Sequence, residues 1–203
     1  MAETKITICN KALNLIGEEG INSLNDNSLQ ATACKNNYDL ALQTILEEGV
    51  WTFATTEAPL VRVETDEYSE EQKYVYSLPA NCVLISEVYK KGDRKHAPNK
   101  LDWDIRYIPS KNNKYIVCDA DEDVYIEYTY NNSNINTYSA SFINALIARL
   151  AYQICMYVTK DIEKTNMMLA YYEKLMADAM RKNYNEDGED KIRWKSFLTS
   201  SRG

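Results

Sequence analysis

The sequence predicts an α+β fold: a four-helix bundle of two N-terminal and two C-terminal helices, with an inserted antiparallel β-domain and an extended C-terminal tail. Two changes of hydrophobic periodicity carry this prediction. Apolar residues recur every three or four positions at both ends of the chain, and every second position in the middle. Of the 203 residues, 45% are hydrophobic and 26% charged, so the chain can bury a core. We therefore expect the bundle at 1–50 and 138–184, the β-domain at 51–137, and the tail at 185–203.

The first two predicted helices lie in the N-terminal quarter of the chain. An apolar face with helical spacing runs through Ile6, Cys9, Leu13 and Ile16. Gly17 follows where a helix end is expected. A second helix is predicted over 28–48, with Asn27 and Gln30 forming a capping box at its start and Gly49 at its end.

The middle of the chain is typical of β-structure. Strands are predicted at 74–78, 83–89, 103–108, 115–118 and 124–130. Pro79 would stop the first strand, and the pair Asn112–Asn113 predicts a hairpin turn. In 124–130, Val124, Ile126, Tyr128 and Tyr130 alternate with Tyr125, Glu127 and Thr129. This period of two indicates a half-buried antiparallel strand.

Helical spacing returns in the last third. A third helix is predicted to begin near Ser139, and a fourth to begin with a cap at Thr159 or Asp161. Each of the four helices is too narrowly amphipathic to be stable alone, so packing between them must supply the stability.

Charge and cysteine usage exclude several classes of protein. The net charge of -7 argues against a general nucleic-acid binder, because phosphate binding needs clustered Lys and Arg. No stretch resembles a signal peptide or a membrane span of roughly 20 apolar residues, so we expect no membrane partner. Five single cysteines without a CxxC pattern indicate reduced, mostly buried thiols of a cytosolic product.

The sequence offers little that could perform catalysis. The one histidine, His96, lies in a charged segment that favours a solvated loop over a catalytic pair. Asp119, Asp121 and Asp123 imitate the opening of a calcium loop, but Val124 and Tyr130 occupy the positions that need Gly and Glu. There is no Gly-rich phosphate loop. We therefore expect no enzyme, no cofactor and no metal, although two carboxylates from distant loops could still form a pair.

Five short motifs follow one another along nearly the whole chain. They are N-x-x-L-x-x-I-G at 10–17, I-x-S-L at 21–24, a segment with Gly, Trp and Phe at 49–54, a segment with Tyr, Leu and Pro at 76–82, and an apolar stretch with helical spacing at 142–151. In this order they resemble tail tubular protein A of podoviruses and related head-to-tail adaptors. Asn81 stands where that family commonly has Asp.

The resemblance implies a structural protein of the phage virion. Members of the family form a ring, usually of twelve copies, below the portal protein. The ring joins the capsid to the downstream tail or nozzle protein and surrounds the channel through which DNA leaves, without sequence-specific binding. The chain is then expected to be made in the host cytoplasm and to reside in the neck of the virion.

Two segments are candidates for contacts with partners. Lys90, Lys91, Arg94 and Lys95 form a basic loop that could contact DNA or an acidic neighbour, although a solvated hairpin tip is the simpler interpretation. In the tail, the apolar residues are Ile192, Trp194, Phe197 and Leu198. They could dock on a neighbouring subunit, the portal or a tail component, or fold back on their own bundle.

Two alternative functions stay open. The chain could be a tail-associated glycan hydrolase that uses Asp and Glu, which would need two close carboxylates in a cleft. It could also be a cytosolic helical interaction module unrelated to phages. A glycan-cleavage assay and the presence of a neighbouring portal gene would separate these alternatives from the adaptor.

Overall fold

The computed structural model describes residues 3–65, 68, 73–93 and 101–186. The chain divides into two compact units: a helical unit, Met1–Phe53 with Ser133–Gly203, and a β unit, Ala54–Asn132. The sequence predicts these boundaries at 50/51 and 137/138. Each unit is described by itself.

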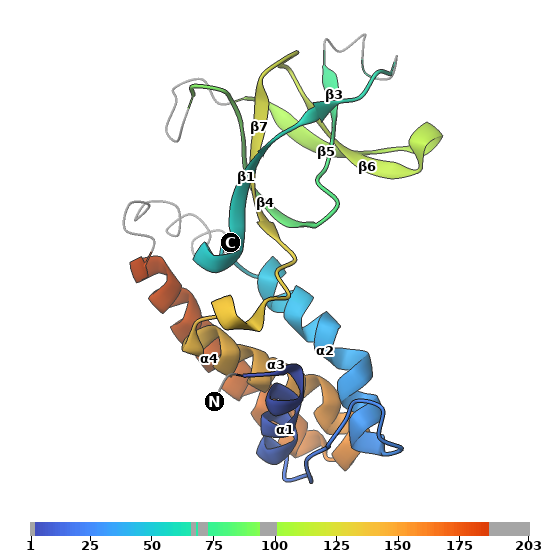
Figure 1. Cartoon of the computed structure of the whole chain (residues 1–203), viewed down its shortest axis with the longest axis vertical. Coiled ribbons are helices and arrows are strands. Elements are labelled where there is room, and N and C mark those ends of the chain that lie inside the picture. The colour runs from blue at the N-terminus through green and yellow to red at the C-terminus, as the bar shows by residue number, and fades with distance from the viewer. Residues whose placement is uncertain (1–2, 66–67, 69–72, 94–100, 187–203) are drawn as a thin grey trace. The chain divides into compact units, whose positions relative to one another are not determined.

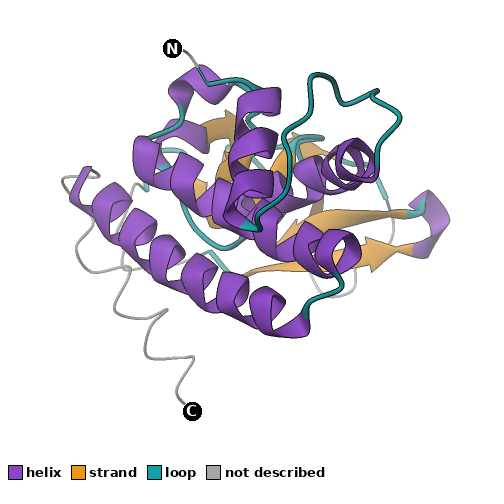
Figure 2. Ribbon diagram, turned by 90° about the horizontal axis from the view of Figure 1, so that it is seen from below, coloured by secondary structure: helices purple, strands orange, loops and turns teal. Residues whose placement is uncertain are grey.

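The helical unit contains α1 (Lys5–Leu15), α2 (Leu29–Glu47), α3 (Ala140–Thr159) and α4 (Ile162–Glu186) (Figure 1). Helix α3 packs against each of the other three, whereas α1 and α2 barely contact each other. Its buried side chains surround most of the helix, and three of them are the small residues Ala145, Ala148 and Ala151, which let neighbouring helices approach closely. A helix that is apolar nearly all round is a central one. Figure 2 shows the helices of this unit from below.

The predicted fold class is therefore wrong beyond its broad α+β character. A four-helix bundle places its helices around a shared axis, each packed against two neighbours. Here one helix is surrounded by the other three. The predicted tail also begins too early, because α4 continues through Glu186. Residues 187–203 lie outside the described residues.

Local sequence signals explain where the helices begin and end. Ser139 caps α3 as predicted, and its side chain accepts a hydrogen bond from the Phe142 N–H. Helix α2 is capped by Ser28, so the predicted capping box of Asn27 with Gln30 is wrong. At the end of α1, Gly17 has a φ of +78°. Its N–H and that of Glu18 donate to carbonyls of the last turn, which forms the glycine-dependent Schellman cap.

An aromatic cluster fills one end of the helical unit. Trp51 meets Phe142 edge-on at 4.8 Å between ring centroids, and Phe53 meets the same ring at 4.7 Å. The indole N–H of Trp51 donates to the Ile45 carbonyl at 2.9 Å. Aromatic pairs in this geometry stabilise a core beyond the area that they bury. The two aromatic residues of the 49–54 motif therefore serve the core of the helical unit.

The β unit consists of two antiparallel sheets, whereas the sequence predicts one inserted antiparallel domain without dividing it. One sheet has the order β1 (Thr55–Pro59), β7 (Val124–Tyr130), β4 (Cys82–Lys90). The other has the order β2 (Val61–Arg62), β3 (Tyr74–Ser77), β6 (Asn113–Cys118), β5 (Trp103–Ile108). Strands of both sheets share one core, which includes Tyr76, Val88, Ile116 and Ile126.

Two strands of the β unit escaped prediction, and one hairpin was confirmed. Strands β1 and β2 are short and largely exposed, and Pro59 lies within β1, so no alternation reveals them. Strands β5 and β6 pair antiparallel, and Asn112 between them adopts the left-handed conformation with φ of 50°. Asparagine tolerates this conformation better than most residues, which is why the hairpin could be predicted.

Helix α3 also corrects the expectation that no segment could cross a membrane. Among the described residues, α3 is long and apolar enough to span one by length and composition. Its contacts with α1, α2 and α4 account for that composition, since a central helix of a packed unit meets the same criterion.

Candidate functional site

The segments predicted to contact partners lie mostly outside the described residues. This holds for Ile192, Trp194, Phe197 and Leu198 of the tail, and for Arg94 and Lys95 of the basic loop. Lys90 ends β4 and is exposed, as is Lys91, whose N–H donates to the Asp123 carbonyl at 2.8 Å. A contact of this loop with DNA or an acidic neighbour therefore stays a prediction.

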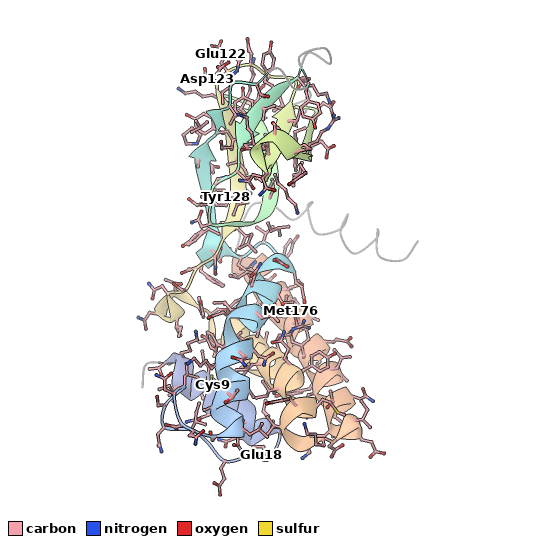
Figure 3. The ribbon with its side chains drawn as sticks, turned by 90° about the vertical axis from the view of Figure 1, so that its right-hand side faces the viewer. Cys9, Glu18, Glu122, Asp123, Tyr128 and Met176 are labelled. Carbon is pink, nitrogen blue, oxygen red and sulfur yellow. The ribbon has the colours of Figure 1, made fainter. Side chains whose placement is uncertain are left out.

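In the acidic turn between β6 and β7, the described side chains do not converge on one point. Asp119, Asp121 and Asp123 are all exposed, and Figure 3 shows Glu122 and Asp123 on the turn. Asp123 has a φ of 53°, which fits a tight turn. Within the ranges that the structure describes, no three His, Cys, Asp or Glu side chains lie where they could hold one ion.

A groove crosses the surface of the helical unit between α1 and α4, with α3 as its floor. Its volume is about 320 Å³, and it is lined by Lys11, Asn14, Leu15, Asn144, Ile147, Tyr171 and Leu175. The Lys164 ammonium on α4 donates to the Ile16 carbonyl at 3.0 Å, which links the two walls near the end of α1. We call this feature the α1–α4 groove.

The rim of the α1–α4 groove exposes apolar surface. Leu15 on α1 is 39% exposed and Tyr171 on α4 is 40% exposed. One helical turn before Tyr171, Met167 is 66% exposed, so the apolar strip continues along α4. Contiguous exposed apolar surface marks sites of contact with other macromolecules, and the groove offers contact area without a reactive group.

A second candidate is an acidic row on the three-stranded sheet. Glu127 on the central strand β7 is directly opposite Glu57 on β1 and Glu87 on β4. Side chains of directly paired residues lie on the same face of a sheet, here the face opposite Ile126 and the core. Glu127 is only 6% exposed. We call these three residues the acidic row.

Neighbours of the acidic row are also unusual. On one side, the rings of Tyr89 and Tyr125 stack with centroids 6.0 Å apart. On the other side, Thr129 is fully buried, and its hydroxyl has no hydrogen-bond partner among the described residues. The alternation in 124–130 places Tyr125, Glu127 and Thr129 on one face, but the sequence contains no signal that pairs Glu127 with Glu57 and Glu87.

None of the five cysteines, all of which the structure describes, lies in a site suited to thiol chemistry. All five are free thiols, and only Cys82 is not buried. The thiols of Cys9 on α1, labelled in Figure 3, and Cys34 on α2 share a hydrogen bond that raises the pKa of Cys9 and lowers the pKa of Cys34. Burial raises the pKa of Cys82 to about 11. Inert thiols of this kind mainly fill the core.

A polar cluster connects three helices near the end of α2. The Tyr172 hydroxyl on α4 donates to the Glu48 carboxylate at 2.6 Å, and the Arg149 guanidinium on α3 lies 5.1 Å from the Tyr172 ring centroid. Burial, followed by the hydrogen bond to Glu48, raises the pKa of Tyr172. The tyrosine therefore stays protonated, and its role here is to hold the helices together.

Two asparagine side chains bind the backbone of the irregular segments that follow α1 and α2. The Asn10 side chain accepts from the Ile21 N–H at 2.8 Å and donates to the Ile21 carbonyl at 2.9 Å. Asn183 on α4 donates to the Val50 carbonyl at 2.7 Å and accepts from the Thr52 N–H at 3.0 Å. Each side chain replaces the hydrogen bonds that an irregular segment cannot make internally.

Comparison with known proteins adds no relative. No family model matches the chain, and no curated protein matches it. The resemblance to head-to-tail adaptors therefore depends on the motifs alone.

Proposed function

We propose that this protein is a structural virion subunit, a head-to-tail adaptor that forms a ring below the portal of a tailed phage. The observation that carries the proposal is the α1–α4 groove with its exposed apolar rim at Leu15 and Tyr171, together with the exposed Met167 one turn away on α4. A subunit of a closed ring needs two different surfaces, one of which receives the other from the next copy. The groove is suited to be the receiving surface.

The motifs of the resemblance support the same function. Asn10 anchors the loop after α1, Leu13 and Ile16 are buried, and Gly17 completes the cap. Trp51 and Phe53 build the aromatic core of the same unit. Four of the five motifs thus lie in the helical unit, as expected if that unit is the shared scaffold of the family, and the motif at 76–82 lies in the β unit.

The partners of the proposed ring are other copies of the chain, the portal above it and a downstream tail or nozzle protein below it. DNA would pass through the channel without being held, since the net charge of -7 opposes tight phosphate binding. The apolar tail residues Ile192, Trp194, Phe197 and Leu198 would dock on one of these protein partners.

The experiment combines the purified full-length chain with the portal protein of the same genome. Electron microscopy and mass measurement should show rings only when both are present. Leu15→Glu and Tyr171→Glu should abolish the rings, because each places a charge on the groove rim. Leu40→Glu is the matched control, since Leu40 on α2 is 56% exposed and lies outside the groove. Rings that form equally in all variants would exclude the groove as the interface, and a chain that never joins the portal would exclude the function.

The glycan hydrolase alternative gives a contrasting expectation. It requires two carboxylates beside a cleft that admits a sugar ring, and the acidic row is the closest grouping of glutamates that we describe. Glu127 at its centre is almost fully buried, which leaves no space for a substrate there. We expect no release of reducing sugar from host cell-surface glycans by the full chain.

A further inference from the structure

We propose that, in the unassembled chain, the α1–α4 groove is covered by the chain's own C-terminal segment, residues 192–198. The inference rests on the proposed ring, because it says what keeps the receiving surface of each subunit closed until the portal is present. Three observations carry it: the lining of the groove, the place where α4 ends, and the pattern of apolar and charged residues in 187–198.

The α1–α4 groove has the size and the lining of a site for one or two large side chains. Its volume of about 320 Å³ is at the small end of the range for ligand sites. Leu15, Ile147 and Leu175 give it apolar walls and floor. Asn144 on α3 also lines the groove and is exposed, so its amide oxygen can accept a hydrogen bond from a ligand. The groove therefore suits an aromatic side chain that carries a polar N–H.

The segment 192–198 supplies such a side chain. Phe197 and Leu198 follow Trp194 by three and four positions, so one helical turn would place all three on the same face. Tryptophan is among the residues that most often anchor an interface from within a pocket. Its indole N–H is a hydrogen-bond donor that Asn144 can receive. Burial of one large aromatic side chain removes roughly 150–250 Å² of surface from water.

The end of α4 places this segment within reach of the groove of its own chain. The α4 wall of the groove lies at Tyr171 and Leu175, and α4 ends at Glu186. At a rise of 1.5 Å per residue, this wall lies roughly 16–22 Å before the end of the helix. The eight residues 187–194 span at most about 26–29 Å when extended. If the chain reverses after α4, Trp194 therefore reaches the groove.

The connecting residues 187–190 have a charge that favours this return along α4. They are three acidic residues and one glycine. Arg181 and Lys182 share a single carboxylate, that of Asp178, so the last turns of α4 keep a positive charge there. Lys182 lies on the same helix face as Leu175, seven residues earlier. A connector that runs from the end of α4 toward the groove therefore passes a surface of opposite charge.

The segment that covers the groove belongs to the same chain because the two are tethered. A short flexible linker gives an effective concentration of roughly 1 mM, which is about a thousand times the concentration of a second copy at 1 µM. The chain's own segment therefore occupies the groove before a neighbour can. A partner that takes the segment away, such as the portal, opens the groove to the next copy.

The first test is cross-linking of the full chain without the portal. Unlabelled and ¹⁵N-labelled chains are mixed and treated with a short amine-reactive cross-linker, which joins neighbouring lysines. We expect Lys11, which lines the groove, to be joined to Lys195 in peptides of a single isotope content. Leu15→Glu should lower the yield several-fold, because it places a charge on the groove rim, whereas Leu40→Glu on α2 should leave the yield unchanged. Lys35, which is exposed on α2, should give no cross-link to Lys195.

The second test measures self-association of the full chain without the portal, by mass measurement over a series of concentrations. The double variant Trp194→Ser with Leu198→Ser should associate several-fold more strongly than the parent chain, because its groove is uncovered. Leu15→Glu added to this double variant should remove the gain, since the uncovered rim then carries a charge. Ser200→Ala, which lies outside the segment, is the matched control. Circular dichroism checks that every variant folds.

The outcomes separate this inference from the proposed function. Cross-links between Lys11 and Lys195 that are absent, or that have only mixed isotope content, overturn the covering of the groove by its own segment and leave the adaptor function standing. The same holds if the double variant associates no more strongly than the parent chain. Single-chain cross-links and stronger association of the double variant, in a chain that never joins the portal, support the covering and overturn the adaptor function.

Discussion

Asn183→Ala should destabilise the helical unit by about 2–3 kcal/mol, because this side chain holds the segment after α2 to the last turns of α4. Asn183 is 6% exposed. Its amide donates to Val50 O at 2.7 Å, and its carbonyl accepts from the Thr52 N–H at 3.0 Å and the Thr52 hydroxyl at 3.2 Å.

The magnitude follows from the groups left behind. Each lost hydrogen bond costs about 0.5–1.5 kcal/mol, and a buried group left without a partner costs about 1–3 kcal/mol. Thr52 is exposed, so water can replace part of its bond, whereas Val50 is half-buried and its carbonyl is harder to hydrate. The sum lies near 2–3 kcal/mol, or about 4–12 °C in Tm for a chain of this length.

The assay is urea unfolding of the full chain, followed by circular dichroism and by tryptophan fluorescence, since Trp51 is buried beside the affected segment. Asn185→Ala is the matched control, because Asn185 lies two residues further along α4 and is exposed. The reasoning would be refuted if Asn183→Ala changed the free energy of unfolding by no more than Asn185→Ala does.

Two further predictions concern the end of α1 and the β unit. Gly17→Ala should lower the free energy of unfolding by about 1–2 kcal/mol, because Gly17 has a φ of +78°. Gly17→Asn should lower it less, since asparagine tolerates a positive φ better than alanine. Equal losses in the two variants would contradict the conformational argument. Burial raises the pKa of Tyr76 to about 12 from an ordinary value of 10. Between pH 10 and 12 the folded state thus keeps the Tyr76 proton that the unfolded state releases. The stability that Tyr76 contributes through this proton is complete below pH 10 and is lost as the pH rises toward 12. Tyr76→Phe also loses the hydrogen bond to the Ala120 carbonyl at 2.8 Å, so the variant should be less stable at neutral pH. It should then lose less stability than the parent chain between pH 10 and 12. If the free energy of unfolding falls equally steeply with pH in both proteins, Tyr76 is not the group responsible.

The parts of the fold that depend on local chemistry could be predicted from the sequence. Helical spacing located four helices, Ser139 capped α3, Gly17 ended α1, and Asn112 marked the hairpin of β5 and β6. These features depend on residues within one or two turns of each other, so the necessary interactions lie within a short stretch of sequence. The choice between Asn27 and Ser28 as a cap shows the limit, because both residue types suit that position.

The arrangement of those elements was decided only by tertiary structure. Which helix is central depends on how four apolar faces share one core, and short exposed strands such as β1 have no pattern of their own. The acidic row exists because antiparallel register aligns Glu57 and Glu87, 30 residues apart in number, with Glu127 on the strand between them. Register is set by packing between segments distant in the chain, and no local pattern records it. The sequence alone thus determined where helices and turns form, whereas long-range packing determined which side chains meet.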